Sequence, residues 1–91
     1  MSDPRALAAA YGVRVERANL GDWGGVTLCA EYDPDGPVIR IDPRAVPPAA
    51  EARAIAHELY HHREAIGEVP RLPTRVAREA AADAYAAALT A

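Results

Sequence analysis

The 91-residue sequence has no phenylalanine, no lysine and a single cysteine, Cys29. One cysteine excludes an internal disulfide and a metal site built from several thiolates. Hydrophobic residues make up 51% of the chain, which favours a folded protein over a disordered one, although much of that share is alanine. With no phenylalanine to fill it, the core is expected to be thin. Cys29 is expected to be a small buried residue.

The charges also exclude several classes of function. All ten basic residues are arginines scattered along the chain, and the net charge is −3, so no basic run indicates a nucleic-acid surface. No stretch is long and apolar enough to span a membrane, and the N-terminus, with Asp3 and Arg5, is too polar for a signal peptide. We therefore expect residues 1–91 to form one domain in the reducing cytoplasm, without a nucleic-acid or membrane partner.

Capping residues predict three helices. Asp3 and Thr74 are suited to begin a helix, and Gly12 and Gly67 are suited to follow the end of one. The expected helices cover residues 3–11, 48–66 and 74–91.

Alternation of apolar and polar residues predicts three strands. These strands cover residues 13–17, 26–32 and 37–42. The Asp33-Pro34-Asp35-Gly36 turn should join the second and third strands as a hairpin. The order of elements predicts an α+β fold, in which an N-terminal helix, a central helix and a C-terminal helix pack against a small twisted three-stranded sheet.

The central helix contains the string His57-Glu58-Leu59-Tyr60-His61. Two histidines four residues apart lie on one helix face about one turn apart, so both imidazoles can bind one metal ion, and zinc is the preferred choice. Glu58 cannot easily reach that metal, and it is placed instead to take a proton from a metal-bound water. This division of roles is the His-Glu-x-x-His signature of zinc-dependent peptidases.

A catalytic zinc site needs a third protein ligand. Cys29 is excluded because it lies in a strand far upstream. The remaining candidates are His62, Glu64, Glu68, Glu79 and Asp83.

Helix geometry argues against the two nearest candidates. His62 points about 120° away from the mean direction of His57 and His61. It falls on the stripe formed by Ile55, Leu59 and Ile66, where it is expected to pack. Glu64 shares the face of the two histidines. Three ligands from consecutive turns of one straight helix fit a tetrahedral site poorly, however, so Glu64 is expected to be exposed.

Glu79 is the best third ligand. It lies near the start of the last helix, after a loop long enough to turn that helix antiparallel to the central one. Asp83 follows four residues later on the same face. One of the two carboxylates would bind the metal, and the other would accept a hydrogen bond from the free N–H of a ligand histidine and fix its ring.

The two motifs together resemble a known peptidase pattern. His57-Glu58-Leu59-Tyr60-His61 followed by Glu79-Ala80-Ala81-Ala82-Asp83 is similar to the gluzincin pattern, His-Glu-x-x-His followed by Glu-x-x-Ala-Asp/Asn. From about residue 5 to residue 89 the chain more closely resembles the ImmA/IrrE family of bacterial and phage-associated zinc peptidases. The strand-turn-strand before the central helix and the run Tyr85-Ala86-Ala87 also match that family.

The resemblance implies a role for each motif residue. His57, His61 and Glu79 would bind zinc, and Asp83 would support a ligand histidine. Glu58 would act as general base in hydrolysing a peptide bond of a protein substrate, such as a transcriptional repressor.

Two further features of the site are expected. A sheet edge near the cleft would hold the extended peptide, and residues 26–32 are our choice for that edge. The oxyanion needs a donor besides zinc, and for each candidate the alternative is an aromatic ring packed on the thin core. The candidates are Tyr32, Tyr60, Tyr85 and His62.

One residue departs from the family pattern. Tyr60 stands where the family usually has a small residue, so it would narrow the cleft or hold the helix further from the sheet. An alternative hypothesis is therefore a metal-stabilised module that binds a regulatory partner protein with little peptidase activity. The presence of Glu58 argues against it, because a structural zinc needs no general base. A coincidental motif, the third hypothesis, predicts no stoichiometric metal.

Overall fold

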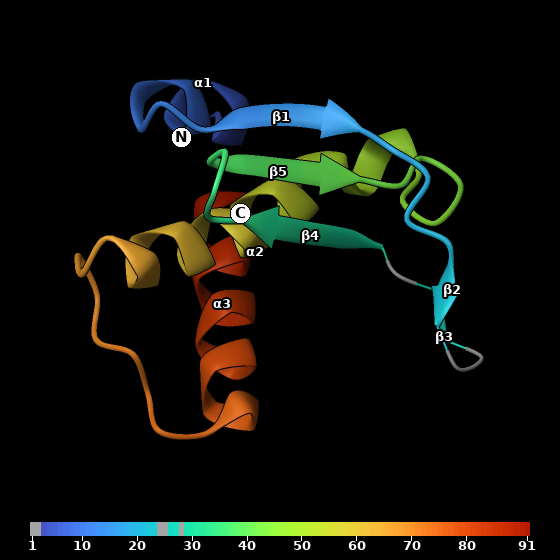
Figure 1. Cartoon of the computed structure of the whole chain (residues 1–91). Helices are drawn as coiled ribbons and strands as arrows, with labels where there is room; N and C mark the ends of the chain where they lie inside the picture. Colours follow the sequence, from blue (N-terminus) through green and yellow to red (C-terminus); the bar gives the residue numbers. More distant parts are fainter. Residues whose placement is uncertain (1–2, 24–25, 28) are drawn as a thin grey trace.

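Three helices and one three-stranded sheet form the fold (Figure 1). It is seen in a computed structural model that describes residues 3–23, 26–27 and 29–91. The helices are α1 (Pro4–Ala10), α2 (Pro48–Ala65) and α3 (Arg75–Leu89). The sheet consists of β1 (Arg14–Arg17), β4 (Ala30–Asp33) and β5 (Val38–Ile41). The predicted α+β class, with its three helices and three-stranded sheet, is confirmed.

Strand β5 lies at the centre of the sheet, in the order β1-β5-β4. β4 pairs antiparallel with β5 and places Tyr32 opposite Ile39, as the predicted hairpin requires. β1 pairs parallel with β5 and places Val15 opposite the same residue. Because side chains directly opposite each other share a face, Val15, Ile39 and Tyr32 lie side by side. β4 is left at one edge of the sheet.

The prediction of one continuous strand over residues 26–32 is wrong. The structure divides it into β3 (Val26–Thr27), which pairs with β2 (Asp22–Trp23) as a separate antiparallel pair, and β4. The last bond near the main sheet runs from the Asp42 N–H to the Cys29 carbonyl. Because alternate residues of an antiparallel strand bond to the same neighbour, the next donor of this ladder would be Arg44, and its N–H bonds to the Asp42 carboxylate. Leu28, part of the predicted strand, lies outside the described residues.

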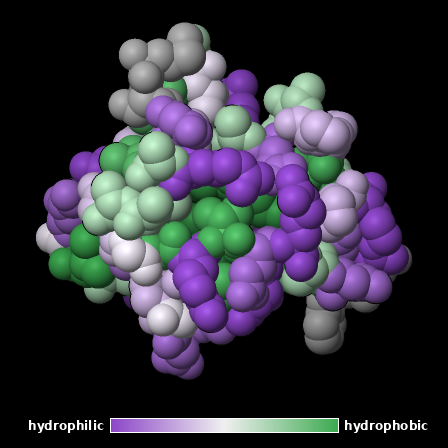
Figure 2. Space-filling model, turned by 90° about the horizontal axis from the view of Figure 1, so that it is seen from above, coloured by the Kyte–Doolittle hydropathy of each residue, from purple (hydrophilic) through white to green (hydrophobic). Residues whose placement is uncertain are grey.

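Apolar side chains between the sheet and α2 form the core. Ile39 and Ile41 of β5 are almost fully buried against Ile55 and Leu59 of α2. The buried cluster is completed by Ala8, Val13 and Val46. The core is small enough that apolar side chains remain visible within a ring of polar ones on the side of α1 and β1 (Figure 2).

The ends of the helices follow the predicted caps. The Asp3 carboxylate accepts a hydrogen bond from the Arg5 N–H at the start of α1, and the Thr74 hydroxyl accepts one from the Ala77 N–H at the start of α3. After α2, Gly67 has a φ of +76°, a left-handed conformation that side-chain-bearing residues rarely adopt. The chain can therefore reverse direction there, and α3 packs along α2.

The predicted packing stripe of α2 is correct only up to the end of the helix. Ile55, Leu59 and His62 are buried, whereas Ile66 is 54% exposed. α2 ends at Ala65, and Ile66 is its non-helical cap, so its side chain leaves the stripe. None of the helices in the described part of the chain has the length and hydrophobicity needed to cross a lipid bilayer.

Candidate metal centre

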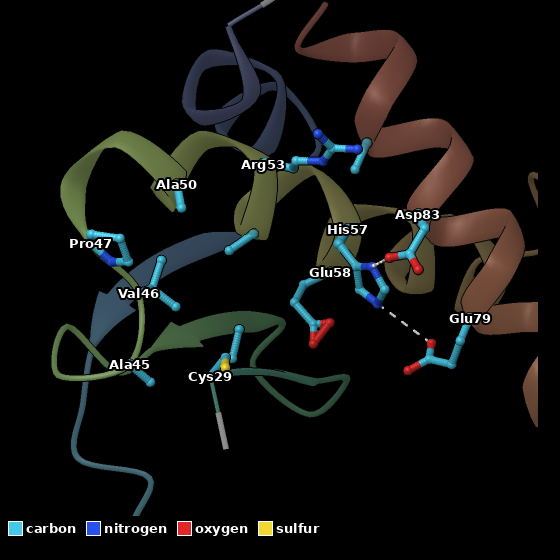
Figure 3. Close-up of a pocket in the computed structure, with 13 residues that line it drawn as sticks. Cys29, Ala45, Val46, Pro47, Ala50, Arg53, His57, Glu58, Glu79 and Asp83 are labelled. Carbon is cyan, nitrogen blue, oxygen red and sulfur yellow. Dashed lines mark hydrogen bonds and ion pairs between the residues drawn. The ribbon is translucent and has the colours of Figure 1, made fainter. Parts of the chain in front are cut away.

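Two imidazoles of α2 and one carboxylate of α3 meet at the surface between these helices. The Nε2 atoms of His57 and His61 lie 3.5 and 2.7 Å from the Oε2 atom of Glu79. The two imidazole rings are 5.2 Å apart between centroids and steeply inclined to each other. Figure 3 shows His57 pointing from α2 towards Glu79 and Asp83 on α3. The structure thus brings together the three residues predicted as metal ligands.

Each of these histidines is also held at its other ring nitrogen. The Nδ1 atom of His57 is 2.7 Å from Oδ1 of Asp83, and the Nδ1 atom of His61 is 2.7 Å from Oε1 of Glu64. A carboxylate at Nδ1 fixes the tautomer that leaves Nε2 with its lone pair free for a metal. Because His57 meets Asp83 and His61 meets Glu79, the two helices approach each other in the antiparallel sense that was expected.

The donor atoms fit a divalent metal ion. Within the described residues, Oε2 of Glu79 is buried and makes no hydrogen bond, although it lies close to the Nε2 atoms of His57 and His61. Ligand atoms around a tetrahedral zinc ion are about 3.3 Å apart, and the two distances to Glu79 lie on either side of that value. Two imidazole nitrogens and one carboxylate oxygen are also ligands that zinc prefers. Donor atoms of His57, Glu58 and His61 lie within 4.8 Å of one another as well.

Glu58 is the buried carboxylate beside this group. It is 8% exposed, and its Oε2 atom makes no hydrogen bond within the described part of the chain. Burial raises the pKa of Glu58, and the nearby imidazoles of His61 and His57 oppose that rise. In Figure 3 its carboxylate projects into the cleft beside His57. Such a carboxylate is positioned to exchange a proton with a molecule bound between the two helices.

The prediction that Glu64 is exposed is wrong. Its side chain is only 8% exposed and is bonded to His61, and its second oxygen is buried and has no hydrogen-bond partner in the part of the chain that the structure describes. A spacing of three residues places Glu64 beside His61 on the helix surface, which is the signal that identifies this contact. Glu64 was considered only as a metal ligand, and its role as the acceptor for His61 Nδ1 was missed.

Neither of the other two alternative ligands reaches the site. His62 is 5% exposed and packs in the interior as predicted, where burial lowers its pKa and its Nδ1 atom is 2.7 Å from the Tyr32 hydroxyl. Glu68 lies beyond the end of α2, where its carboxylate accepts hydrogen bonds from the Tyr11 hydroxyl and from Arg63. Both side chains connect elements of the fold.

Tyr60 contacts α3 and does not line the cleft. Its ring lies 5.7 Å from that of Tyr85 and 6.3 Å from that of His61, between centroids. The expected narrowing of the cleft by Tyr60 is therefore not seen. The four oxyanion candidates, Tyr32, Tyr60, Tyr85 and His62, are all missing from the described residues that line the cleft.

A cleft of about 460 Å³ extends from the candidate metal centre along the first turns of α2. His57, Glu58, Glu79 and Asp83 line one part of it. Cys29 borders the cleft and is exposed, so the prediction of a buried cysteine is wrong. Strand β4, at the edge of the sheet, begins directly after Cys29.

Comparisons with known proteins add no further identification. No family model matches the chain, and searches of curated proteins and of solved structures find no match. The functional interpretation is therefore based on the geometry of the site and on the residues of the two motifs.

Proposed function

We propose that this protein is a zinc-dependent peptidase of the kind that its resemblance to the ImmA/IrrE family implies. The observation that carries the proposal is the convergence of His57 Nε2, His61 Nε2 and Glu79 Oε2 without hydrogen bonds between them. Isolated acidic and histidine side chains at a surface normally pair or turn to water. A catalytic metal site requires such donor atoms close together, next to a buried carboxylate like that of Glu58, whose Oε2 atom makes no hydrogen bond within the described residues.

Zinc would be held by His57, His61 and Glu79, and a position would be left open for water. When bound, zinc supplies a Lewis acid that lowers the pKa of that water and polarises the scissile carbonyl. Asp83 and Glu64 accept the Nδ1 protons of His57 and His61 and hold both rings in register. The fixed orientation avoids reorganising the rings when substrate enters.

Glu58 is the residue that transfers the proton. Its carboxylate accepts a proton from the attacking water and later delivers it to the leaving amine. Burial favours this role because a carboxylate that is poorly solvated binds a proton more readily than an exposed one. No neighbouring hydrogen bond competes for its Oε2 atom among the described residues.

The edge strand β4 supports a protein substrate. Among the described strands β4 pairs only with β5, so its other side has backbone groups that an extended peptide can pair with. Ala30, the first residue of β4, lines the cleft together with His57 and Glu58. A peptide added to this edge would run past the carboxylate of Glu58. We propose a cytoplasmic protein, such as a transcriptional repressor, as the class of substrate.

Replacement of Glu58 tests the catalytic part of the proposal. We expect Glu58→Gln to keep about one zinc per chain and to lose at least a hundredfold in peptide hydrolysis, because the amide cannot accept the proton. Hydrolysis would be followed by mass spectrometry on a mixture of unstructured proteins, with Glu16→Gln on β1 as the control. Equal cleavage by the wild type and Glu58→Gln would contradict the assignment.

A second candidate function is supported by one observation. None of the four proposed oxyanion donors is among the described residues that line the cleft, and an oxyanion donor is what a fast peptidase needs besides its metal. The alternative is a metal-stabilised module that binds a regulatory partner protein. This alternative predicts that the Glu58→Gln protein has the same effect in cells as the wild type, whereas the peptidase proposal predicts that this effect is lost.

A further inference from the structure

The cleft has a second, apolar part that the proposed chemistry does not use. In Figure 3, Ala45, Val46, Pro47 and Ala50 lie on one side of Glu58, and Glu79 and Asp83 lie on the other. The apolar part is completed by Ala30 and Ala54. Small side chains leave room there, and the cleft volume of about 460 Å³ is within the range of ligand-binding pockets, roughly 300–1,000 Å³.

Arg53 is the basic side chain of this cleft. Among the described residues that line it, Arg53 alone carries a positive charge at every pH of interest. Its guanidinium makes no hydrogen bond or ion pair within the described part of the chain. In contrast, Arg17, Arg40 and Arg63 each contact a carboxylate. Arg53 therefore has all its donors available to a ligand.

The position of Arg53 sets the distance between its charge and the reacting groups. Arg53 lies four residues before His57 on α2, which corresponds to a rise of about 6 Å on the same helix face. An extended peptide covers that distance in about two residues. A carboxylate bound by Arg53 would thus belong to a residue about two positions from the peptide group next to Glu58.

We propose that the cleft selects a peptide segment with an apolar side chain next to the scissile bond and an acidic side chain about two residues away. The apolar side chain occupies the alanine-lined part, and the acidic one pairs with Arg53. The inference rests on the proposed peptidase function, because it defines the segment that this site would cut. An internal aspartate or glutamate is the ligand, since a protein substrate is cut within its chain.

Binding of short peptides to an inactive protein tests this selection. The probes are fluorescein-labelled hexapeptides of alanine with one leucine, blocked at the C-terminus as the amide. Each carries a single glutamate or glutamine one to three positions from the leucine, on either side. Their dissociation constants for zinc-supplied Glu58→Gln protein would be measured by fluorescence anisotropy at low and high salt.

We expect one glutamate peptide to bind about three- to fivefold more tightly than its glutamine counterpart, the range of a partly exposed ion pair. This preference should vanish in 0.5 M salt. Adding Arg53→Gln should remove the preference and leave binding of the glutamine peptide unchanged, and adding Arg53→Glu should reverse it. The control Arg14→Gln, an exposed arginine on β1, should leave the preference intact.

The apolar part is tested by filling it. Ala50→Tyr should weaken binding of every leucine peptide at least fivefold, whereas Ala49→Tyr, the preceding exposed residue that does not line the cleft, should have no effect. Zinc content should stay the same in both variants.

Two results would overturn the proposal: no binding of any peptide, or a glutamate preference that survives Arg53→Gln. An equal change for glutamate and glutamine peptides in Arg53→Gln would also overturn it, since Arg53 would then affect binding without pairing with the glutamate side chain. Peptide hydrolysis by the wild-type protein is measured separately. Selection that depends on Arg53 without any cleavage would keep this inference and reject the peptidase function.

Discussion

The two site histidines are each contacted at both ring nitrogens by carboxylates. Glu79 faces the Nε2 atoms of both histidines. Asp83 contacts Nδ1 of His57, and Glu64 contacts Nδ1 of His61. The two Nδ1 contacts differ in their surroundings, because the side chain of Asp83 is 73% exposed and that of Glu64 is 8% exposed. A hydrogen bond shielded from water orients its ring more firmly, so Glu64 is expected to contribute more than Asp83 to metal affinity.

Removing the carboxylate of Glu64 should therefore weaken zinc binding. We expect Glu64→Ala to raise the dissociation constant for zinc about tenfold or more, because His61 loses the acceptor that fixes its tautomer. Glu64→Gln should restore much of the affinity, since its amide oxygen still accepts the Nδ1 proton. The dissociation constants would be measured by competition with a chromophoric chelator. An unchanged constant in a folded Glu64→Ala protein would show that this contact plays no part.

Side-chain contacts between elements place β4 relative to the site helix. The Tyr32 hydroxyl of β4 and the buried Nδ1 atom of His62 on α2 are 2.7 Å apart, and their rings meet edge to face. This bond fixes the edge strand against the helix that carries His57 and Glu58. The same imidazole also packs on the Tyr11 ring, which follows α1.

Tyr32→Phe should destabilise the fold by about 1–2 kcal/mol, because it leaves a buried ring nitrogen without its partner. Tyr60→Phe is a matched control, since the Tyr60 hydroxyl makes no hydrogen bond in the described part of the chain. Urea unfolding followed by circular dichroism measures both. If both variants unfold at the wild-type midpoint, the Tyr32–His62 bond adds nothing to stability.

Local signals predicted the helices better than the strands. Asp3, Gly67 and Thr74 act through their own backbone neighbours, so the ends of the helices could be read from the sequence. A strand depends on a partner elsewhere in the chain. The division of residues 26–32 depends on the segment after β5, where the N–H groups of Arg44, Ala45 and Val46 bond back to Asp42.

The site was predictable where helix geometry alone determines it. His57, His61, Glu79 and Asp83 are brought together because two helix faces with four-residue spacing meet. The roles of Glu64 and Arg53 were not predicted from the sequence, because they depend on which other side chains approach α2. Neither the pairing of Glu64 with His61 nor the lack of a partner for Arg53 among the described residues follows from composition.

At the scale of the whole molecule, buried polar groups hold segments of the chain together in addition to the small apolar core. The Asp42 carboxylate, fully buried at the end of β5, accepts hydrogen bonds from the guanidinium of Arg44 and from the N–H groups of Arg44 and Leu20. The bonds from the Arg44 side chain, together with these backbone bonds, hold the pKa of Asp42 well below its usual range, although burial opposes this. The carboxylate thus joins the segment after β1 to the turn that follows β5.

Acid should therefore destabilise the fold through Asp42. The unfolded chain takes up this proton near pH 4, whereas the folded chain resists it to lower pH. Stability from the ionised group is present above about pH 4 and is lost as the pH falls below it. In urea unfolding between about pH 2 and pH 7, Asp42→Asn should be less stable at neutral pH and should lose less on acidification than the wild type.

The control for acid unfolding is Asp35→Asn, an exposed residue of the turn between β4 and β5. Its profile should follow that of the wild type. Parallel profiles for Asp42→Asn and the wild type below pH 4 would assign the acid sensitivity to other carboxylates.

The zinc-to-protein ratio is the measurement that tests the central claim most directly. Protein purified without chelator would be analysed by elemental mass spectrometry as wild type, Glu79→Ala and Glu16→Ala; Glu79 and Glu16 are similarly exposed, at 43% and 44%. If His57, His61 and Glu79 form one site, the wild type and Glu16→Ala will hold about one zinc per chain, and Glu79→Ala will hold far less. A wild-type protein that stays free of zinc after zinc is supplied, or full occupancy in Glu79→Ala, would contradict the three-residue site.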